Sequence, residues 1–190
     1  MVGESFTIGR RGTAGEPFVL NEDADGSLIS EVTTVANTLG QMLDAEFAVE
    51  RGNGSSGIVV GVPEEFDALP IQVAFEDDVL SRDEYALKST PDGVFCPGAT
   101  PLAATFAAWD LLRQMGYRFF FPSPRWEINP DHESIAVELD VMESSEWYYR
   151  CGPRSMPGAT QHETFANRWE VWMIRNRINS SFRLESGHSW

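Results

Sequence analysis

The sequence has only two cysteines, Cys96 and Cys151, among its 190 residues. Two thiols cannot form a disulfide framework, and they cannot supply a four-thiolate metal site. We expect both to be buried free thiols, because a free cysteine behaves as a small apolar side chain. A single bridge between the two is the alternative.

Basic residues are also scarce, with 14 Lys and Arg against 29 Asp and Glu and a formal net charge of −15. This charge repels phosphate backbones and anionic lipid headgroups, so we expect neither nucleic acid nor a membrane surface as a partner. No apolar run approaches the about 18 residues that a membrane span needs. Residues 1–11 lack the charged-then-apolar order of a secretory leader. Localisation therefore stays open between a cytoplasmic protein and a secreted or periplasmic one whose leader was removed.

Histidine occurs three times, and none of the three has a partner at metal-ligand spacing. His162-Glu163 begins like a zinc-binding helix, but Ala166 stands where the second imidazole would be needed. We therefore expect no metal and no other cofactor. No Ser or Cys nucleophile can be paired with a histidine from the sequence. Adjacent acids such as Glu64-Glu65 and Asp77-Asp78 are typical of solvated surface rather than of a glycosidase pair, so no catalytic residue is assigned.

Residues 52–57 read Gly-Asn-Gly-Ser-Ser-Gly, which matches the spelling of a dinucleotide-binding fingerprint. That site needs a helix after the glycines, so that the helix N-terminus faces the pyrophosphate. The apolar run Ile58–Val62 follows instead, which predicts a strand. We expect a hairpin loop here rather than a nucleotide site.

A content of 42% hydrophobic and 12% aromatic residues is enough to build a globular core. Apolar periodicity predicts three helices, Ser30–Glu46 with Ser30 as N-cap, Pro101–Met115 with Thr100 as N-cap, and His162–Arg175. Residues 64–81 show no clean period and predict a long connection. Strands are predicted at Phe6–Ile8, Pro17–Leu20, Glu46–Glu50, Ile58–Val62, Glu84–Ser89, Val94–Pro97, Arg118–Phe121, Ser134–Val141 and Trp147–Tyr149.

Two of these strands flank Thr90-Pro91-Asp92-Gly93, which predicts a type I turn in a hairpin. From this hairpin to Pro122 the sequence reads DEYALKSTPDGVFCPGATPLAATFAAWDLLRQMGYRFFFP. The order of two strands, a helix and a Gly-aromatic-Arg-aromatic strand resembles the N-terminal domain that precedes the catalytic barrel in family 67 α-glucuronidases. It is also similar to bacterial proteins with domain of unknown function 4838, and more distantly to β-hexosaminidases. With GIVVGVP at residues 57–63, the resemblance covers about residues 5–142.

The aromatic C-terminal segment resembles the beginning of the barrel that follows this domain. WYYR ending at Arg150, WMIRNRIN and GHSW look like its first strand, first helix and second strand. The resemblance implies that five side chains bind sugar hydroxyls or carboxylates, namely Arg150, Arg175, Asn176, Asn179 and His188. The alternative is that RNRIN holds a barrel helix in place. The paired acids of the resembling enzymes belong to barrel strands that this sequence does not contain.

Together these patterns predict an α/β (α+β) fold, a mixed β-sheet with two helices packed on it, followed by a truncated start of a TIM barrel. Residues 1–142 are expected to be an accessory domain of glycoside hydrolases, and residues 143–190 a partial first βαβ unit. The function implied is a non-catalytic N-terminal domain that supports the barrel of a carbohydrate-active protein, with a carbohydrate as partner through that parent. A stand-alone carbohydrate-binding module and a protein-interaction domain that associates through the aromatic tail are the alternatives.

Overall fold

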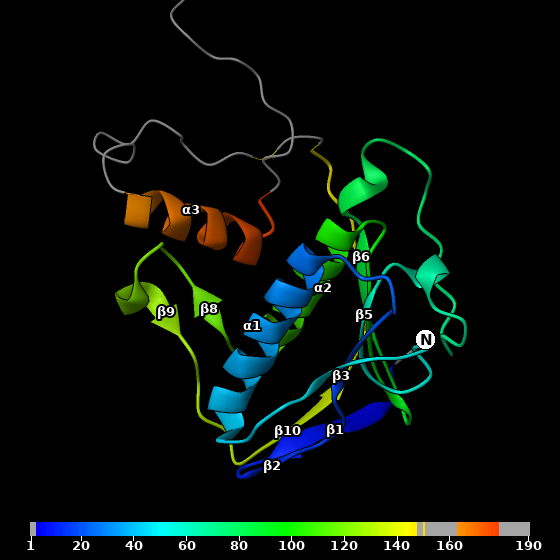
Figure 1. The fold of residues 1–190 in the computed structure, drawn as a ribbon, viewed down its shortest axis with the longest axis horizontal. Coiled ribbons are helices and arrows are strands. Elements are labelled where there is room, and N and C mark those ends of the chain that lie inside the picture. The colour runs from blue at the N-terminus through cyan, green and yellow to red at the C-terminus, as the bar shows by residue number, and fades with distance from the viewer. Residues whose placement is uncertain (1–2, 148–149, 151–162, 179–190) are drawn as a thin grey trace, which may run out of the picture.

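The computed structural model describes residues 3–147, 150 and 163–178. Three helices, eleven strands and three short 3₁₀ turns are present in these residues (Figure 1). In chain order they are β1 Ser5–Arg10, β2 Thr13–Ala14, β3 Phe18–Leu20, α1 Gly26–Leu43, β4 Val49–Arg51, β5 Gly57–Gly61, η1 Pro63–Glu65, η2 Ser81–Asp83, β6 Tyr85–Thr90, β7 Gly93–Pro97, α2 Pro101–Gln114, β8 Arg118–Phe119, η3 Pro124–Trp126, β9 Glu127–Ile128, β10 Ser134–Glu138, β11 Asp140–Glu143 and α3 Glu163–Arg175.

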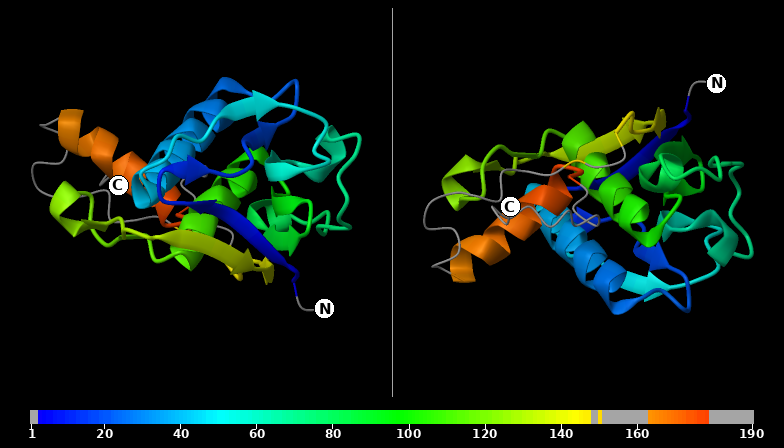
Figure 2. Two further views of the ribbon diagram at one scale, coloured as in Figure 1. Left: turned by 90° about the horizontal axis from the view of Figure 1, so that it is seen from below. Right: turned by 90° about the horizontal axis from the view of Figure 1, so that it is seen from above.

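A six-stranded sheet with the order β11-β6-β7-β5-β3-β4 forms the centre of the fold. Strands β4, β3, β5 and β7 are parallel, whereas β6 and β11 are added antiparallel at one edge. Helices α1 and α2 pack side by side against one face, and their apolar residues meet the strands in one large core (Figures 1 and 2). The predicted mixed sheet with two helices packed on it is therefore confirmed. The β6–β7 hairpin is also confirmed, since Thr90 pairs with Gly93 across its turn.

The opposite face of the sheet is covered by the long segment between β5 and β6. Residues 64–81, predicted to be a connection, contain only the last two residues of η1 and the first residue of η2. Their apolar side chains nevertheless shield the outward side of the parallel strands, so β5 is buried over its whole length. This second small core consists of Val19, Val59 and Phe95, covered by Phe66, Leu69 and Ile71.

Helix α1 begins four residues before the predicted N-cap. Asp25 is the N-cap, and its Oδ1 accepts a hydrogen bond from the Leu28 N–H at 2.8 Å, while Ser30 lies inside the helix. Helix α2 begins as predicted, with Thr100 Oγ1 accepting from the Ala103 N–H at 3.1 Å. Gly116 follows α2 with φ +100°, a left-handed conformation that suits a glycine after a helix.

The predicted single strand Ser134–Val141 is wrong, because it is two strands in different sheets. β10 pairs with β1 in a three-stranded sheet, whereas β11 pairs with β6 in the central one. Leu139 lies between them, and its backbone N–H donates to Ser89 Oγ at 2.7 Å. Alternation of apolar residues continues through this transfer, so the pattern itself does not reveal it.

The predicted hairpin loop at residues 52–57 is also wrong. The loop joins β4 to β5, and both strands run parallel to β3 on opposite sides of it. The chain must therefore cross one face of β3, and a Cβ on Gly52 or Gly57 would come within 3.0 Å of Val19. Strand β5, and not a helix, follows the loop as expected.

Several other predictions differ only at their edges or fall on residues without a described structure. β8 has two residues rather than four, because the chain turns after Phe120 and the Ser123 N–H donates to the Phe121 carbonyl at 2.6 Å. Cys96 is a buried free thiol as expected, and Cys151 lies outside the described residues. Trp147 is not in a strand, and residues 148–149 lie outside the described residues. None of the helices in the described part of the chain is long and apolar enough to cross a membrane.

Candidate functional site

Helix α3 packs beside β8 and β9, on the side of the molecule away from residues 64–81 (Figures 1 and 2). The Phe119 carbonyl at the end of β8 accepts two hydrogen bonds from α3 and the residue after it, from Trp172 Nε1 and from Asn176 Nδ2, each at 3.0 Å. The rings of Trp169 and Trp172 lie 5.0 Å apart on α3. Part of the aromatic C-terminal segment is thus packed against the central domain.

Arg175, the last residue of α3, enters a partly buried polar cluster below the helix. Its Nη1 donates to Tyr117 Oη and to Glu127 Oε1, each at 2.7 Å, and its side chain is 13% exposed. Tyr117 in turn donates to Glu127 Oε1 at 2.8 Å. Burial raises the pKa of Tyr117, and the nearby charge of Arg175 only partly offsets this effect. The tyrosine is therefore a neutral donor that completes the charged pair.

Arg177 forms a second contact of the same kind two residues later. Its Nη1 donates to Tyr85 Oη and, at 3.2 Å, to Glu143 Oε2. Burial and the negative charge of Asp110 raise the pKa of Tyr85, against the lowering effect of Arg177. Arg177 has a left-handed backbone with φ +58°, which is uncommon for a residue other than glycine. The turn after α3 is therefore bent so that this side chain reaches β6 and β11.

Arg150 forms a third charged contact between the C-terminal segment and the domain. Its Nη2 donates to Asp83 Oδ2 at 2.8 Å, and the Asp83 side chain is only 3% exposed. The Nε of Arg150 is buried and has no hydrogen-bond partner among the described residues. This contact brings η2 next to the residues that follow β11.

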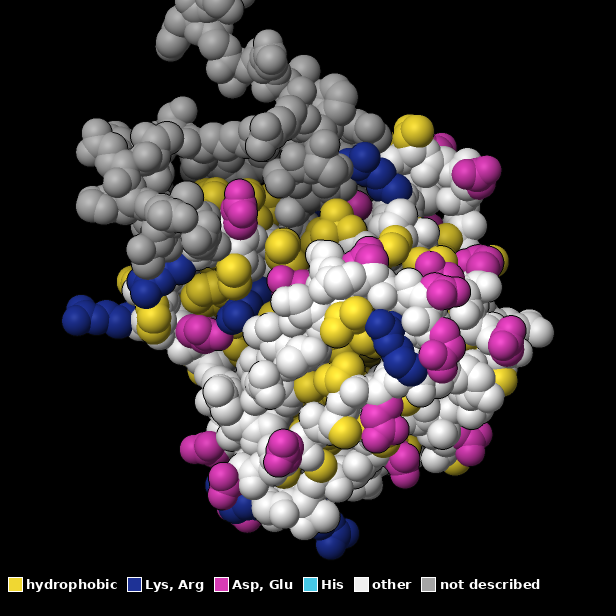
Figure 3. Space-filling model, in the orientation of Figure 1, with side chains coloured by type: hydrophobic (Ala, Val, Ile, Leu, Met, Phe, Trp, Pro, Cys, Tyr) yellow, Lys and Arg dark blue, Asp and Glu magenta, His cyan; other side chains and the backbone are white. Residues whose placement is uncertain are grey.

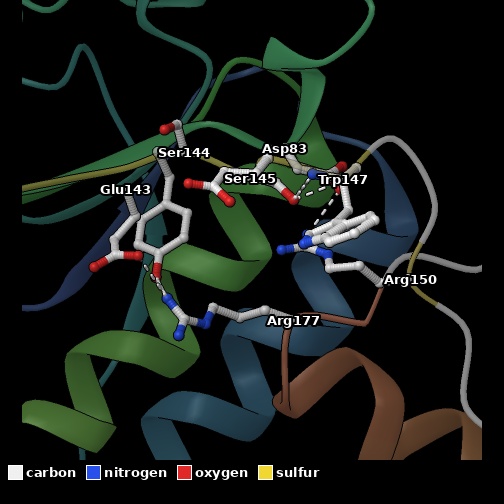
Figure 4. Close-up of a pocket in the computed structure, with 9 residues that line it drawn as sticks. Asp83, Glu143, Ser144, Ser145, Trp147, Arg150 and Arg177 are labelled. Atoms are coloured by element: carbon white, nitrogen blue, oxygen red, sulfur yellow. Dashed lines mark hydrogen bonds and ion pairs between the residues drawn. The ribbon is translucent and has the colours of Figure 1, made fainter.

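A cavity of about 210 Å³ lies where the Arg150 and Arg177 contacts meet. Figure 4 shows Arg150 directed toward Asp83 and Arg177 directed toward Glu143 on different sides of this opening. The remaining lining comes from Tyr85 and from the segment that leaves β11, residues 144–147. Carboxylates, guanidinium groups, hydroxyls and one indole ring therefore surround a single space.

The five sugar-binding residues implied by the family resemblance do not form one described group. Arg150 lines the cavity, whereas Arg175 and Asn176 bind the chain's own tyrosine, carboxylate and carbonyl groups. Asn179 and His188 lie outside the described residues. Sequence reasoning did not select Arg177, although it stands within the same RNRIN segment. It also did not select the cavity residues Asp83, Tyr85 and Glu143, which carry no motif.

The acidic side chains are spread over the described surface. Figure 3 shows them scattered on one face of the molecule instead of gathered at one place. The adjacent acids Asp77 and Asp78 are exposed, as expected for solvated surface. Within residues 3–147, 150 and 163–178, no group of three or more His, Cys, Asp or Glu side chains is arranged to hold a metal ion.

Comparisons with known proteins identify the fold but not a family. No family model matches the sequence, and no curated protein matches it. Among solved structures, the chain is similar to a family GH115 4-O-methyl-α-glucuronidase with specificity for decorated arabinogalactans, at a TM-score of 0.63 and 15% identity. That likeness covers 92% of this chain and 25% of the enzyme, so the chain spans about a quarter of its length.

A second solved structure is less similar. It is the GH20 β-N-acetylhexosaminidase from Streptomyces coelicolor A3(2), with a TM-score of 0.44 and 16% identity, covering 74% of this chain and 24% of that enzyme. At these identities the likeness concerns the fold alone. The chain thus has an α/β fold that also occurs within a much longer glycoside hydrolase.

Proposed function

We propose that this chain is the N-terminal part of a larger, glycoside hydrolase-like protein. Residues 1–142 would be a non-catalytic accessory domain, and residues 143–190 would begin the catalytic barrel. The observation that carries this proposal is the similarity to the α-glucuronidase, which extends over 92% of this chain but only 25% of the enzyme. Fold alone does not determine function, so the role is a proposal that enzymology must test.

The packing of α3 favours the view that the accessory domain holds the barrel in position. In this proposal α3 is the first helix of the barrel. Arg150 and Arg175 pair with carboxylates of the accessory domain, Asp83 and Glu127, and Arg177 donates to the hydroxyl of Tyr85 in the same domain. Two of these arginines also bind a tyrosine hydroxyl, which fixes their direction. A planar guanidinium group that donates to two fixed acceptors gives geometric specificity, so the domain would set the position of the barrel.

An exposed apolar surface lies next to α3. Figure 3 shows apolar side chains on the same side of the molecule as α3 and β9. The patch is continuous with the α3 contact, because it begins one residue after Phe119. We assign this surface to the remainder of the barrel, since exposed apolar patches mark protein contacts. Its most exposed large side chains are Phe120, Phe121, Trp126 and Ile128.

The acidic residues of the cavity also favour support over catalysis by this chain. Hydrolysis of a glycosidic bond requires two carboxyl groups that face each other across the sugar, about 5–10 Å apart. In the cavity, Asp83 and Glu143 each accept a hydrogen bond from an arginine. Each of these carboxylates thus helps to hold an arginine of the C-terminal segment in place.

The proposal is tested by assaying the 190-residue chain beside a version extended to the full length of its parent, on aryl-glycosides that include aryl-glucuronides. We expect hydrolysis by the longer protein and none by the shorter one. Turnover by the 190-residue chain would contradict the non-catalytic role. A longer protein that releases no aryl group from any of these substrates would contradict the glycoside hydrolase assignment.

A further inference from the structure

The cavity between η2, the end of β11 and Arg177 is formed only when the C-terminal segment is in place. Its walls come from parts of the chain that are far apart in sequence, because Asp83 precedes β6 and Arg177 follows α3. The contacts of Arg150 with Asp83 and of Arg177 with Glu143 hold these walls together. The space of about 210 Å³ is below the roughly 300–1,000 Å³ typical of drug-sized pockets, so it suits one small ring.

Both signs of charge line this cavity, which restricts what it can bind. Asp83, Glu143 and Glu146 are acidic, whereas Arg150 and Arg177 are basic. An anion would face the carboxylates, and a cation would face the guanidinium groups. A neutral group that both donates and accepts hydrogen bonds can use all of these side chains. Sugar hydroxyls have this property.

Two further features of the lining favour a sugar ring. The Nε of Arg150 is a buried donor without a partner among the described residues, and such donors are rare unless water or a ligand accepts from them. Trp147 stands at the opening with 68% of its surface exposed. A flat indole ring beside polar groups offers an apolar surface to one side of a ligand while hydrogen bonds fix its edges.

We infer that this cavity binds a single neutral monosaccharide unit, with Trp147 against the ring and with Arg150, Glu143 and Glu146 at its hydroxyls. The choice of ligand class rests on the proposed function, because a carbohydrate-active parent supplies such groups as substrate or product. The cavity lies where the accessory domain meets the C-terminal segment. Sugar binding there can therefore be measured without any hydrolytic activity.

Saturation-transfer NMR on the 190-residue chain tests the inference with D-galactose, D-xylose and D-glucuronate at millimolar concentration. We expect transfer to at least one of the two neutral sugars and a weaker signal for glucuronate. Trp147→Ala should weaken binding of the neutral sugar about three- to tenfold, the range expected for one aromatic contact. Trp126→Ala is the matched control, because Trp126 is 56% exposed and lies outside the cavity.

A second variant, Glu146→Gln, tests the role of charge. It removes one exposed carboxylate from the lining, so it should weaken neutral-sugar binding and raise the affinity for glucuronate. The inference is overturned if neither neutral sugar receives transfer, if the two tryptophan variants behave alike, or if the wild-type chain prefers glucuronate. If the wild-type chain binds neither neutral sugar but the longer protein hydrolyses a glycoside, only the inference about the cavity is rejected. Binding without hydrolysis by the longer protein would reject the proposed function only.

Discussion

The guanidinium carbon of Arg175 lies 4.3 Å from the ring centroid of Trp109, which is fully buried in α2. The same arginine donates to Tyr117 and Glu127, so one side chain links α3 to a helix and to the β8–β9 pair. A cation over an aromatic face and two charge-assisted hydrogen bonds together outweigh the value of an exposed ion pair. Arg175 thus contributes more to the position of α3 than an exposed ion pair would.

Arg175→Ala should lower the free energy of unfolding by about 2–3 kcal/mol, because it leaves Glu127 and Tyr117 without their common donor. Arg125→Ala is the control, since Arg125 is exposed in η3 and its loss should cost at most about 0.5 kcal/mol. Urea unfolding followed by tryptophan fluorescence measures both. Equal midpoints for the two variants would show that Arg175 does not hold α3.

Stability should fall as the pH rises above about 10, where tyrosines of an unfolded chain ionise. Burial raises the pKa of Tyr117 in the folded protein, so above this pH the folded state holds a proton that the unfolded state has lost. The stabilisation is complete below the unfolded pKa and decreases with rising pH. Tyr117→Phe should flatten this decrease between pH 9 and about 11 in urea titrations. An unchanged slope in the variant would assign the loss to other groups, such as Tyr85.

The N-terminus of α1 provides a direct comparison of two candidate caps. Asp25→Ala should cost about 1 kcal/mol, because the Leu28 N–H loses the side-chain acceptor that satisfies it. Ser30→Ala should cost nothing measurable, because Ser30 is exposed within the helix and alanine is the better helix former. Thermal unfolding of the two variants decides between them. A larger loss for Ser30→Ala would place the helix start where sequence reasoning put it.

This comparison shows how far local patterns reach in this chain. Apolar periodicity identified α1, α2 and α3, because a helix that packs on a sheet repeats its buried positions every three or four residues. The cap of α1 was missed although Leu28 continues the apolar period one turn before Val32, because Ser30 is itself a favourable N-cap residue type. The type I turn signature found the β6–β7 hairpin, since Pro91 and Gly93 constrain the backbone directly.

Features set by distant pairing were not predictable in the same way. Nothing local shows that β10 and β11 belong to different sheets, or that the Gly52–Gly57 loop crosses β3, because both depend on which strands become neighbours. The candidate site has the same origin. Arg150 was singled out by resemblance, but its partner Asp83 is 67 positions away in the sequence, and no motif joins them. Only the folded chain brings the two charges together.

Cys96 should be inert in the folded protein. It is fully buried in β7, and burial together with the nearby charge of Asp110 raises the pKa of its thiol, so almost no reactive thiolate exists at neutral pH. In a Cys151→Ser background, an aromatic disulfide reagent should modify no thiol without denaturant and one thiol in urea. The rate of modification should follow the fluorescence change on unfolding. Prompt modification without denaturant would mean that β7 opens locally.

Gly40 in α1 should be required, although glycine inside a helix usually costs about 1 kcal/mol relative to alanine. A Cβ at this position would lie 2.5 Å from the backbone oxygen of Ala45, because the chain folds back closely after the helix. The Gly40 carbonyl also accepts a hydrogen bond from the Ala45 N–H at 3.0 Å, and a shift of this turn would weaken it. The steric cost should therefore exceed the gain in helix propensity.

Gly40→Ala should destabilise the protein by about 1–3 kcal/mol, the range typical of an overpacked site. Gly26→Ala is the matched control in the same helix, because a Cβ at Gly26 meets nothing within 4 Å. That change should be neutral or stabilising, since alanine reduces the conformational freedom of the unfolded chain. Chemical denaturation of both variants gives the comparison. If Gly40→Ala stabilised the protein as much as Gly26→Ala, this result would contradict the close contact between Gly40 and the backbone oxygen of Ala45.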